Sequence, residues 1–171
     1  MKTNIGISDQ DREGVVTILN ALLSDEYILY TKTRNFHWNV LGPQFHDFHK
    51  FFEAQYEEID DIIDEVAERS RALGGLASGS LAEFLEQSRL KEQPARTMAA
   101  KAMVSSLLRD HEAVIQTLRT DLETCAGKYH DAGTSDFLTG LMEQHEKMAW
   151  MLRATLEQRP LVAGSSSRRK H

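Results

Sequence analysis

Apolar residues recur at every third or fourth position over four long stretches of the chain, as they do on one face of an α-helix. The first stretch runs from Asp9 to about Val40. Gly42 and Pro43 then interrupt the pattern, because glycine ends helices at low cost and proline favours the first turn of the next helix. The pattern predicts a long first helix and a second one from about Pro43 to Leu73, closed by two glycines.

The connection after the second helix is long, from Leu76 to Thr97, and contains one short helical segment from Ser80 to Gln87. A connection of this length lets the chain cross a bundle instead of making a tight hairpin. Apolar spacing resumes in the third helix, expected from about Ala95 to Cys125.

The fourth helix is expected to begin at a cap formed by Thr134 or Ser135 and to end near Gln158. Together these elements predict an all-α fold, a ferritin-like four-helix bundle over residues 9–158 whose long crossover carries a short helix. Residues 1–8 are expected to form a flexible N-terminal tail, and residues 159–171 a basic C-terminal tail.

Length and charge narrow the class of protein. The 171 residues suffice for one domain with a substantial core. A net charge of −6 argues against a whole surface built for nucleic acid. Cys125 is the only cysteine, so no disulfide can form within the chain and a reducing compartment is favoured. Without a signal-peptide pattern or a membrane span, we expect a cytoplasmic protein, with nucleoid association as a variant of that location.

The second helix carries an acidic stripe that suggests metal chemistry. Acids on helices usually form a solvated face, and Glu58, Asp61 and Glu65 are read in this way. A second set falls within about 100° of the helix circumference, at the edge of the apolar half; this set comprises His49, Glu53, Asp60, Asp64 and Glu68, and the same sector includes Glu57. Imidazole with carboxylates suits iron, zinc or manganese. The stripe is therefore a candidate iron site.

The spacing of these residues constrains how they can bind a metal. At about 1.5 Å per residue, His49 and Asp64 lie roughly 22 Å apart along one helix. Ligands must lie about 2.0–2.2 Å from a metal, so the two cannot share an ion within one chain. An antiparallel second copy would place Asp64 and Glu68 of one subunit against His49 and Glu53 of the other. His37, at the end of the first helix, can approach His49 from the same subunit.

Other candidate residues have simpler interpretations. A di-iron centre inside one bundle needs Glu-x-x-His pairs, and no Glu in this chain is followed by His three residues later. A di-iron centre of that kind is therefore disfavoured.

His111 and His145 lie inside helices and are expected to pack or to form a hydrogen bond. His46 is expected at the surface or behind the metal ligands. Asp131 and Asp136 flank the start of the fourth helix, where capping is the expected role.

A long motif in the first two helices closely resembles the Dps family, the DNA-binding proteins from starved cells, also called miniferritins. The shared pattern consists of His37-Trp38-Asn39-Val40, Gly42, Phe45 and His49, followed by Asp64, Glu68-Arg69 and Leu73-Gly74-Gly75. The resemblance covers roughly residues 8 to 158. It implies a hollow dodecameric shell that oxidises Fe(II), preferentially with hydrogen peroxide, stores ferric mineral and protects against oxidative stress.

The resemblance also implies a site at the dimer interface that holds two iron ions. By position, His37, His49 and Glu53 would come from one subunit, and Asp64 and Glu68 from its neighbour. His37, His49, Asp64 and Glu68 would be the catalytic residues. The resemblance further offers Asp131 and Asp136 as candidates for acids that line pores admitting iron.

Two rival functions remain open. The shell could be mainly structural, a nucleoid-compacting DNA binder that uses Arg168, Arg169 and Lys170 in its basic tail. Alternatively, the bundle could be a peroxidase without iron or another metal-dependent oxidase. Gel shifts across a salt series and anaerobic Fe(II) titration distinguish these functions from iron storage.

Overall fold

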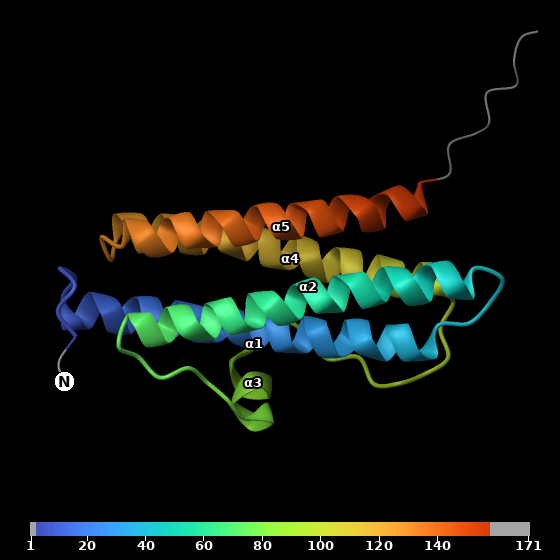
Figure 1. Cartoon of the computed structure of the whole chain (residues 1–171), viewed down its shortest axis with the longest axis horizontal. Coiled ribbons are helices and arrows are strands. Elements are labelled where there is room, and N and C mark those ends of the chain that lie inside the picture. Colours follow the sequence, from blue (N-terminus) through green and yellow to red (C-terminus); the bar gives the residue numbers. More distant parts are fainter. Residues whose placement is uncertain (1–2, 158–171) are drawn as a thin grey trace, which may run out of the picture.

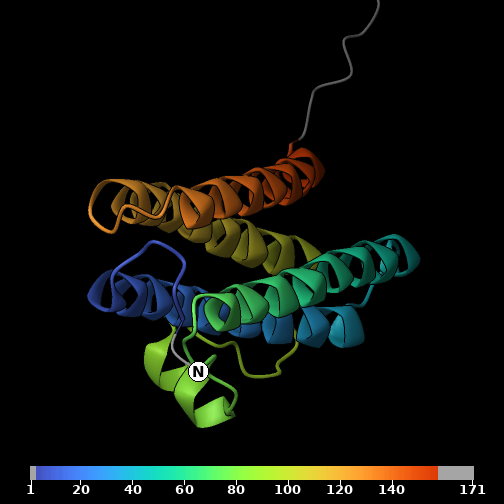
Figure 2. The same cartoon turned by 60° about the vertical axis from the view of Figure 1, so that its left-hand side comes forward.

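A computed structural model describes residues 3–157 of the chain and, within them, contains helices and no strands. The helices are α1 (Asp9–Asn39), α2 (Phe45–Ala72), α3 (Leu81–Gln87), α4 (Ala100–Gly127) and α5 (Ala132–Leu156). Figure 1 shows α1 and α2 as one antiparallel layer, with α4 and α5 as a second layer beside it. Figure 2 shows the two layers from another side, with the crossover and α3 lying outside α1. The predicted all-α, ferritin-like bundle is confirmed.

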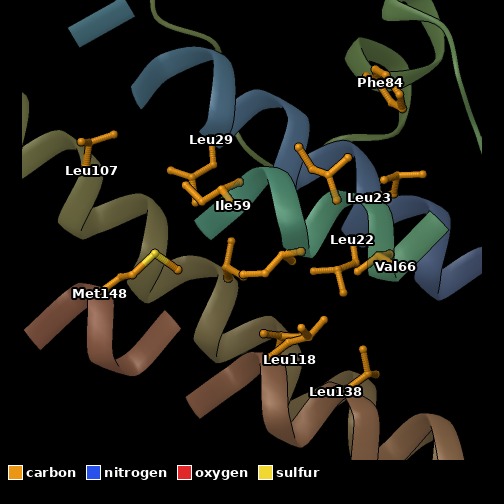
Figure 3. Packing of buried hydrophobic residues seen from close by; sticks show 14 of the residues in the cluster. Leu22, Leu23, Leu29, Ile59, Val66, Phe84, Leu107, Leu118, Leu138 and Met148 are labelled. Atoms are coloured by element: carbon orange, nitrogen blue, oxygen red, sulfur yellow. The ribbon is translucent and has the colours of Figure 1, made fainter. Parts of the chain in front are cut away.

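The core lies between the two helical layers. Figure 3 shows Leu22, Leu29 and Ile59 from one layer pointing toward Leu118 and Met148 from the other. These side chains are at most 1% exposed. Interdigitation of this kind gives each apolar side chain many close contacts, so the two layers behave as one packed body.

The crossover is held against α1 by two buried contacts. The ring of Phe84 in α3 stacks on Tyr27 of α1 with a centroid separation of 3.9 Å. Asp25, which is 1% exposed, accepts bonds from the Ser88 hydroxyl at 3.0 Å and the Arg89 amide at 2.6 Å. Its other oxygen receives the Arg89 guanidinium at 2.7 Å. A buried carboxylate with this many donors fixes the path of the chain beside α1.

The ends of the last two long helices differ from the prediction. The third long helix begins at Ala100 instead of Ala95, because the preceding segment is extended and is held to α1 by a bond from Asn35 to the Gln93 carbonyl. The last long helix is capped by Asp131, so the predicted cap at Thr134 or Ser135 is wrong and the capping role expected of Asp131 is confirmed. Asp131 accepts from the Thr134 amide at 2.9 Å and pairs with Arg69, a partner that only the folded chain supplies.

Residues 3–8 precede α1, and the Ser8 hydroxyl caps that helix by accepting from the Asp11 amide. The predicted basic tail, residues 159–171, lies outside the described residues. Among the helices of the described residues, none is both long and apolar enough to cross a bilayer.

Candidate metal centre

The turn between α1 and α2 brings the two predicted histidine ligands together. Gly42 has a φ of +118°, a conformation that favours glycine, and its carbonyl accepts from the Phe45 amide at 3.0 Å. The chain reverses within five residues, so the last turn of α1 lies beside the first turns of α2. The rings of His37 and His49 stack with centroids 3.8 Å apart and an interplanar angle of 19°.

Reciprocal hydrogen bonds fix the two rings. His37 Nδ1 lies 2.8 Å from the carbonyl oxygen of His49, and His49 Nδ1 lies 2.9 Å from the carbonyl oxygen of His37. A carbonyl can only accept, so each Nδ1 carries the proton and donates. In a neutral imidazole this leaves the lone pair on Nε2, which is the atom free to bind a metal. The bond from His49 also satisfies a carbonyl that the end of α1 leaves without a helical partner.

Aromatic side chains surround the histidine pair. Tyr56 meets the His37 ring edge-on at 5.3 Å, and Phe45 stacks on His49 at 5.0 Å. His37 is 7% exposed, whereas Trp38 beside it is 63% exposed. The pair is therefore held rigidly on its inner side and borders an open surface of the single chain.

Glu53 lies one turn beyond His49 and has a local partner. Its carboxylate pairs with Lys50 at 2.5 Å. The hydrogen bond from Lys50 is the main cause that lowers the pKa of Glu53, helped by the charges of Lys50 and the two histidines and opposed by burial. Sequence reasoning missed this pair, although the spacing of three residues on a helix favours it. Glu53 is ionised at neutral pH and able to exchange Lys50 for a metal.

The carboxylates at the other end of α2 do not join this cluster within one chain. Asp60, Asp64 and Glu68 are exposed, as are Glu57 and His46. Within residues 3–157, no group of three or more His, Cys, Asp or Glu side chains is arranged to hold a metal ion. One chain thus presents His37, His49 and Glu53 at one end of α2 and, about four turns beyond His49, the exposed acids Asp64 and Glu68.

The remaining candidates adopt structural roles. His111 Nδ1 lies 3.0 Å from His145 Nδ1, and both side chains are fully buried, so the expected packing or hydrogen bond is confirmed. Glu26 lies 3.0 Å from His145 and was not predicted as its partner. Asp131 is 3% exposed as a cap, and Asp136 is exposed. Of the two pore candidates, only Asp136 presents an accessible carboxylate in the single chain.

Comparison with known proteins identifies the family. A profile of the ferritin-like domain matches residues 16–162. An uncharacterised low temperature-induced protein of Nostoc sp. is 45% identical over 160 residues, which cover 94% of this chain and 89% of that protein. DNA protection during starvation protein 2 of Bacillus anthracis is 42% identical over 144 residues, which cover 84% and 97%.

A solved structure supports the same assignment. The Dps protein of Vibrio cholerae O1, described as a member of a broad superfamily of ferritin-like diiron-carboxylate proteins, superposes with a TM-score of 0.85. It is 30% identical to this chain, with 92% of this chain and 98% of that protein covered. The chain therefore belongs to the Dps family of ferritin-like proteins.

Proposed function

We propose that this chain is a ferroxidase and iron-storage subunit whose catalytic sites form between two subunits. Each site would combine His37, His49 and Glu53 of one subunit with Asp64 and Glu68 of its partner, and each twofold interface would carry two such sites. The observation that carries the proposal is the reciprocal bonding of His37 and His49, which leaves both Nε2 lone pairs available on a rigid base.

The ligand set suits Fe(II) as substrate. Imidazole nitrogens give the metal fixed directions, and carboxylates offset the charge that rises when Fe(II) becomes Fe(III). When two Fe(II) ions bind together, each gives one electron to hydrogen peroxide. The O–O bond breaks, two protons are taken up and two waters form, so no hydroxyl radical is released. This stoichiometry accounts for the proposed role in protection against oxidative stress, and hydrogen peroxide is the proposed preferred oxidant.

The structure of the single chain supports a site shared by two subunits. His49 and Asp64 lie on the same continuous helix, so about 22 Å of helix separates them. A twofold axis near the middle of α2 would bring the acidic end of one copy to the histidine end of the other. We infer that oxidised iron is released as ferric mineral inside a closed dodecameric shell, as the resemblance to the family implies.

A double variant tests the assignment. Changing His37→Ala together with Asp64→Ala should abolish peroxide-dependent Fe(II) oxidation while the assembled mass in solution stays near that of a dodecamer. Fe(II) titration without oxidant should show two ions per intact site and a loss of both in the variant. Undiminished oxidation by an assembled double variant would contradict the site, and a monomeric wild-type protein would contradict the shared site.

DNA binding is the second candidate, because relatives such as the Bacillus anthracis protein are named for DNA protection. The cations proposed for it are Arg168, Arg169 and Lys170, which lie outside the described residues. Gel shifts should compare the full chain with one truncated after Pro160 across a salt series. A shift that salt weakens and truncation removes supports the tail. A shift that survives truncation assigns DNA binding to another surface.

A further inference from the structure

A second group of titratable side chains lies inside the bundle, away from the metal centre. Glu26 of α1, His145 of α5 and His111 of α4 all have an exposed fraction of 0%. His145 Nε2 lies 3.0 Å from Glu26 Oε1, and His145 Nδ1 lies 3.0 Å from His111 Nδ1. His145 uses opposite edges of its ring for the two contacts, so the three groups form a row. The row links α1 of one layer to α5 and α4 of the other.

The row is isolated from other charges in the core. In the same part of α1 and α4, Lys32 pairs with Asp110 at 2.6 Å, and Asp25 is neutralised by Arg89. Helix α2 brings no buried titratable side chain to the core, because its buried residues are Phe52, Gln55, Ile59, Ile62, Ile63, Val66 and Ser70. From α3 only Phe84 is buried. His145 is therefore the group that must neutralise Glu26.

The two 3.0 Å contacts indicate how many hydrogens the three side chains hold between them. Two nitrogen lone pairs repel at this distance, so one hydrogen must lie between the histidines. A second hydrogen must lie between His145 and Glu26, because a nitrogen lone pair and a carboxylate oxygen also repel. If both histidines were neutral and Glu26 were ionised, His111 would donate to His145 and His145 to Glu26, leaving a net negative charge in the dry core. A buried carboxylate without a counter-charge is far less stable than a neutral pair.

The geometry at Glu26 favours charge over a directional bond. Among the described residues, neither carboxylate oxygen of Glu26 takes part in a hydrogen bond of normal geometry. Coulomb attraction between an imidazolium and a carboxylate tolerates this misalignment. A bond between neutral groups weakens steeply with angle, whether the ring of His145 or a protonated Glu26 is the donor. The 3.0 Å approach is therefore best explained by opposite charges.

We propose that Glu26, His145 and His111 form a buried binding site for one proton, which His145 holds as an imidazolium between the Glu26 carboxylate and Nδ1 of His111. The site takes no second proton. Burial, followed by the charge of His145, holds the pKa of His111 well below its usual range. A row also differs from a metal shell, because the three groups do not converge on one point. The proton site is independent of iron oxidation at the subunit interface.

The bound proton links the packing of the two layers to pH. In the unfolded chain, both histidines are deprotonated above about pH 7.5. The folded protein then holds one proton more than the unfolded chain, so stability falls as pH rises. Relative to Glu26→Gln, which needs no bound proton, the unfolding equilibrium constant of the wild type should rise with pH above about pH 7.5, by about tenfold per pH unit for one bound proton. Two neutral histidines beside an ionised Glu26 would leave that ratio constant.

Solid-state ¹⁵N NMR of the full-length assembled protein, labelled at its histidine nitrogens, tests the site directly at pH 8. We expect one imidazolium signal that disappears in Glu26→Gln and in His145→Gln and remains in His46→Gln, the control at an exposed histidine. Glu26→Gln keeps the shape of the side chain, so it decides the question even if His145→Gln does not assemble.

Two results would overturn the proposal. The first is a wild-type spectrum at pH 8 with only neutral imidazoles, or with an imidazolium signal that Glu26→Gln leaves in place. The second is a shift of the His111 and His145 signals when Zn(II) is added at one ion per subunit to a His37→Phe/His49→Phe background. That shift would make the cluster a metal site.

Discussion

Replacing His37 with phenylalanine separates its structural role from its proposed metal binding. Phenylalanine keeps a flat ring against His49, which stacks at 3.8 Å, but it has neither the Nδ1 donor nor the Nε2 lone pair. One hydrogen bond, to the His49 carbonyl, is lost. The reverse bond from His49 survives, because it ends on the backbone of residue 37. One such bond contributes about 0.5–1.5 kcal/mol.

The expected fall in melting temperature is therefore small, roughly 1–6 °C for a chain of this length. Peroxide-dependent Fe(II) oxidation, followed through the absorbance of the ferric product, should fall to the rate without protein. His46→Phe is the control, since His46 is exposed and lies in the first turn of α2, the helix that carries His49. An assembled His37→Phe protein that oxidises Fe(II) at the wild-type rate would refute the assignment of this ligand.

Two further predictions concern the bundle itself. Asp131→Ala removes both the hydrogen bond to the Thr134 amide and the ion pair with Arg69, so it should destabilise the protein by about 2 kcal/mol or more in chemical denaturation. Asp136→Ala, at an exposed acid, should have little effect. Equal effects of the two variants would contradict the cap. Burial raises the pKa of Cys125 to about 12, so alkylation of the folded protein at pH 8 should be slow and should become fast in denaturant. Because the unfolded thiol loses its proton near pH 8.5, the stability of the wild type should decline from about pH 8.5 toward 12 more steeply than that of Cys125→Ala. Rapid alkylation of the folded protein would contradict the burial of this thiol.

The helices and the meeting of His37 with His49 could be predicted because both depend on local pattern. Apolar periodicity gives the elements, and a glycine–proline turn between two long helices must return the chain beside itself. The sequence alone could not decide which of three candidates, Asp131, Thr134 or Ser135, caps α5. All three are capping residue types, and Arg69, more than sixty residues earlier, favours Asp131.

The buried proton site could be predicted only in part from the sequence. Glu26 falls on the apolar face of α1 between Leu22 and Leu29, and a charged residue there signals a partner in the core. Which histidine pairs with Glu26 depends on how the two layers pack. The reciprocal bonds of His37 and His49 have the same origin, since each requires the exact register between neighbouring helices.

Mixing two inactive variants tests the shared site most directly. One variant, His37→Phe/His49→Phe, loses the histidine half of each site, and the other, Asp64→Ala/Glu68→Ala, loses the acidic half. In a mixed dimer, one of the two sites combines the intact halves, and random mixing makes about half of the dimers mixed. Co-assembly from denaturant should therefore restore about a quarter of the wild-type rate of Fe(II) oxidation. No recovery in a verified mixed assembly would contradict a site built from two subunits.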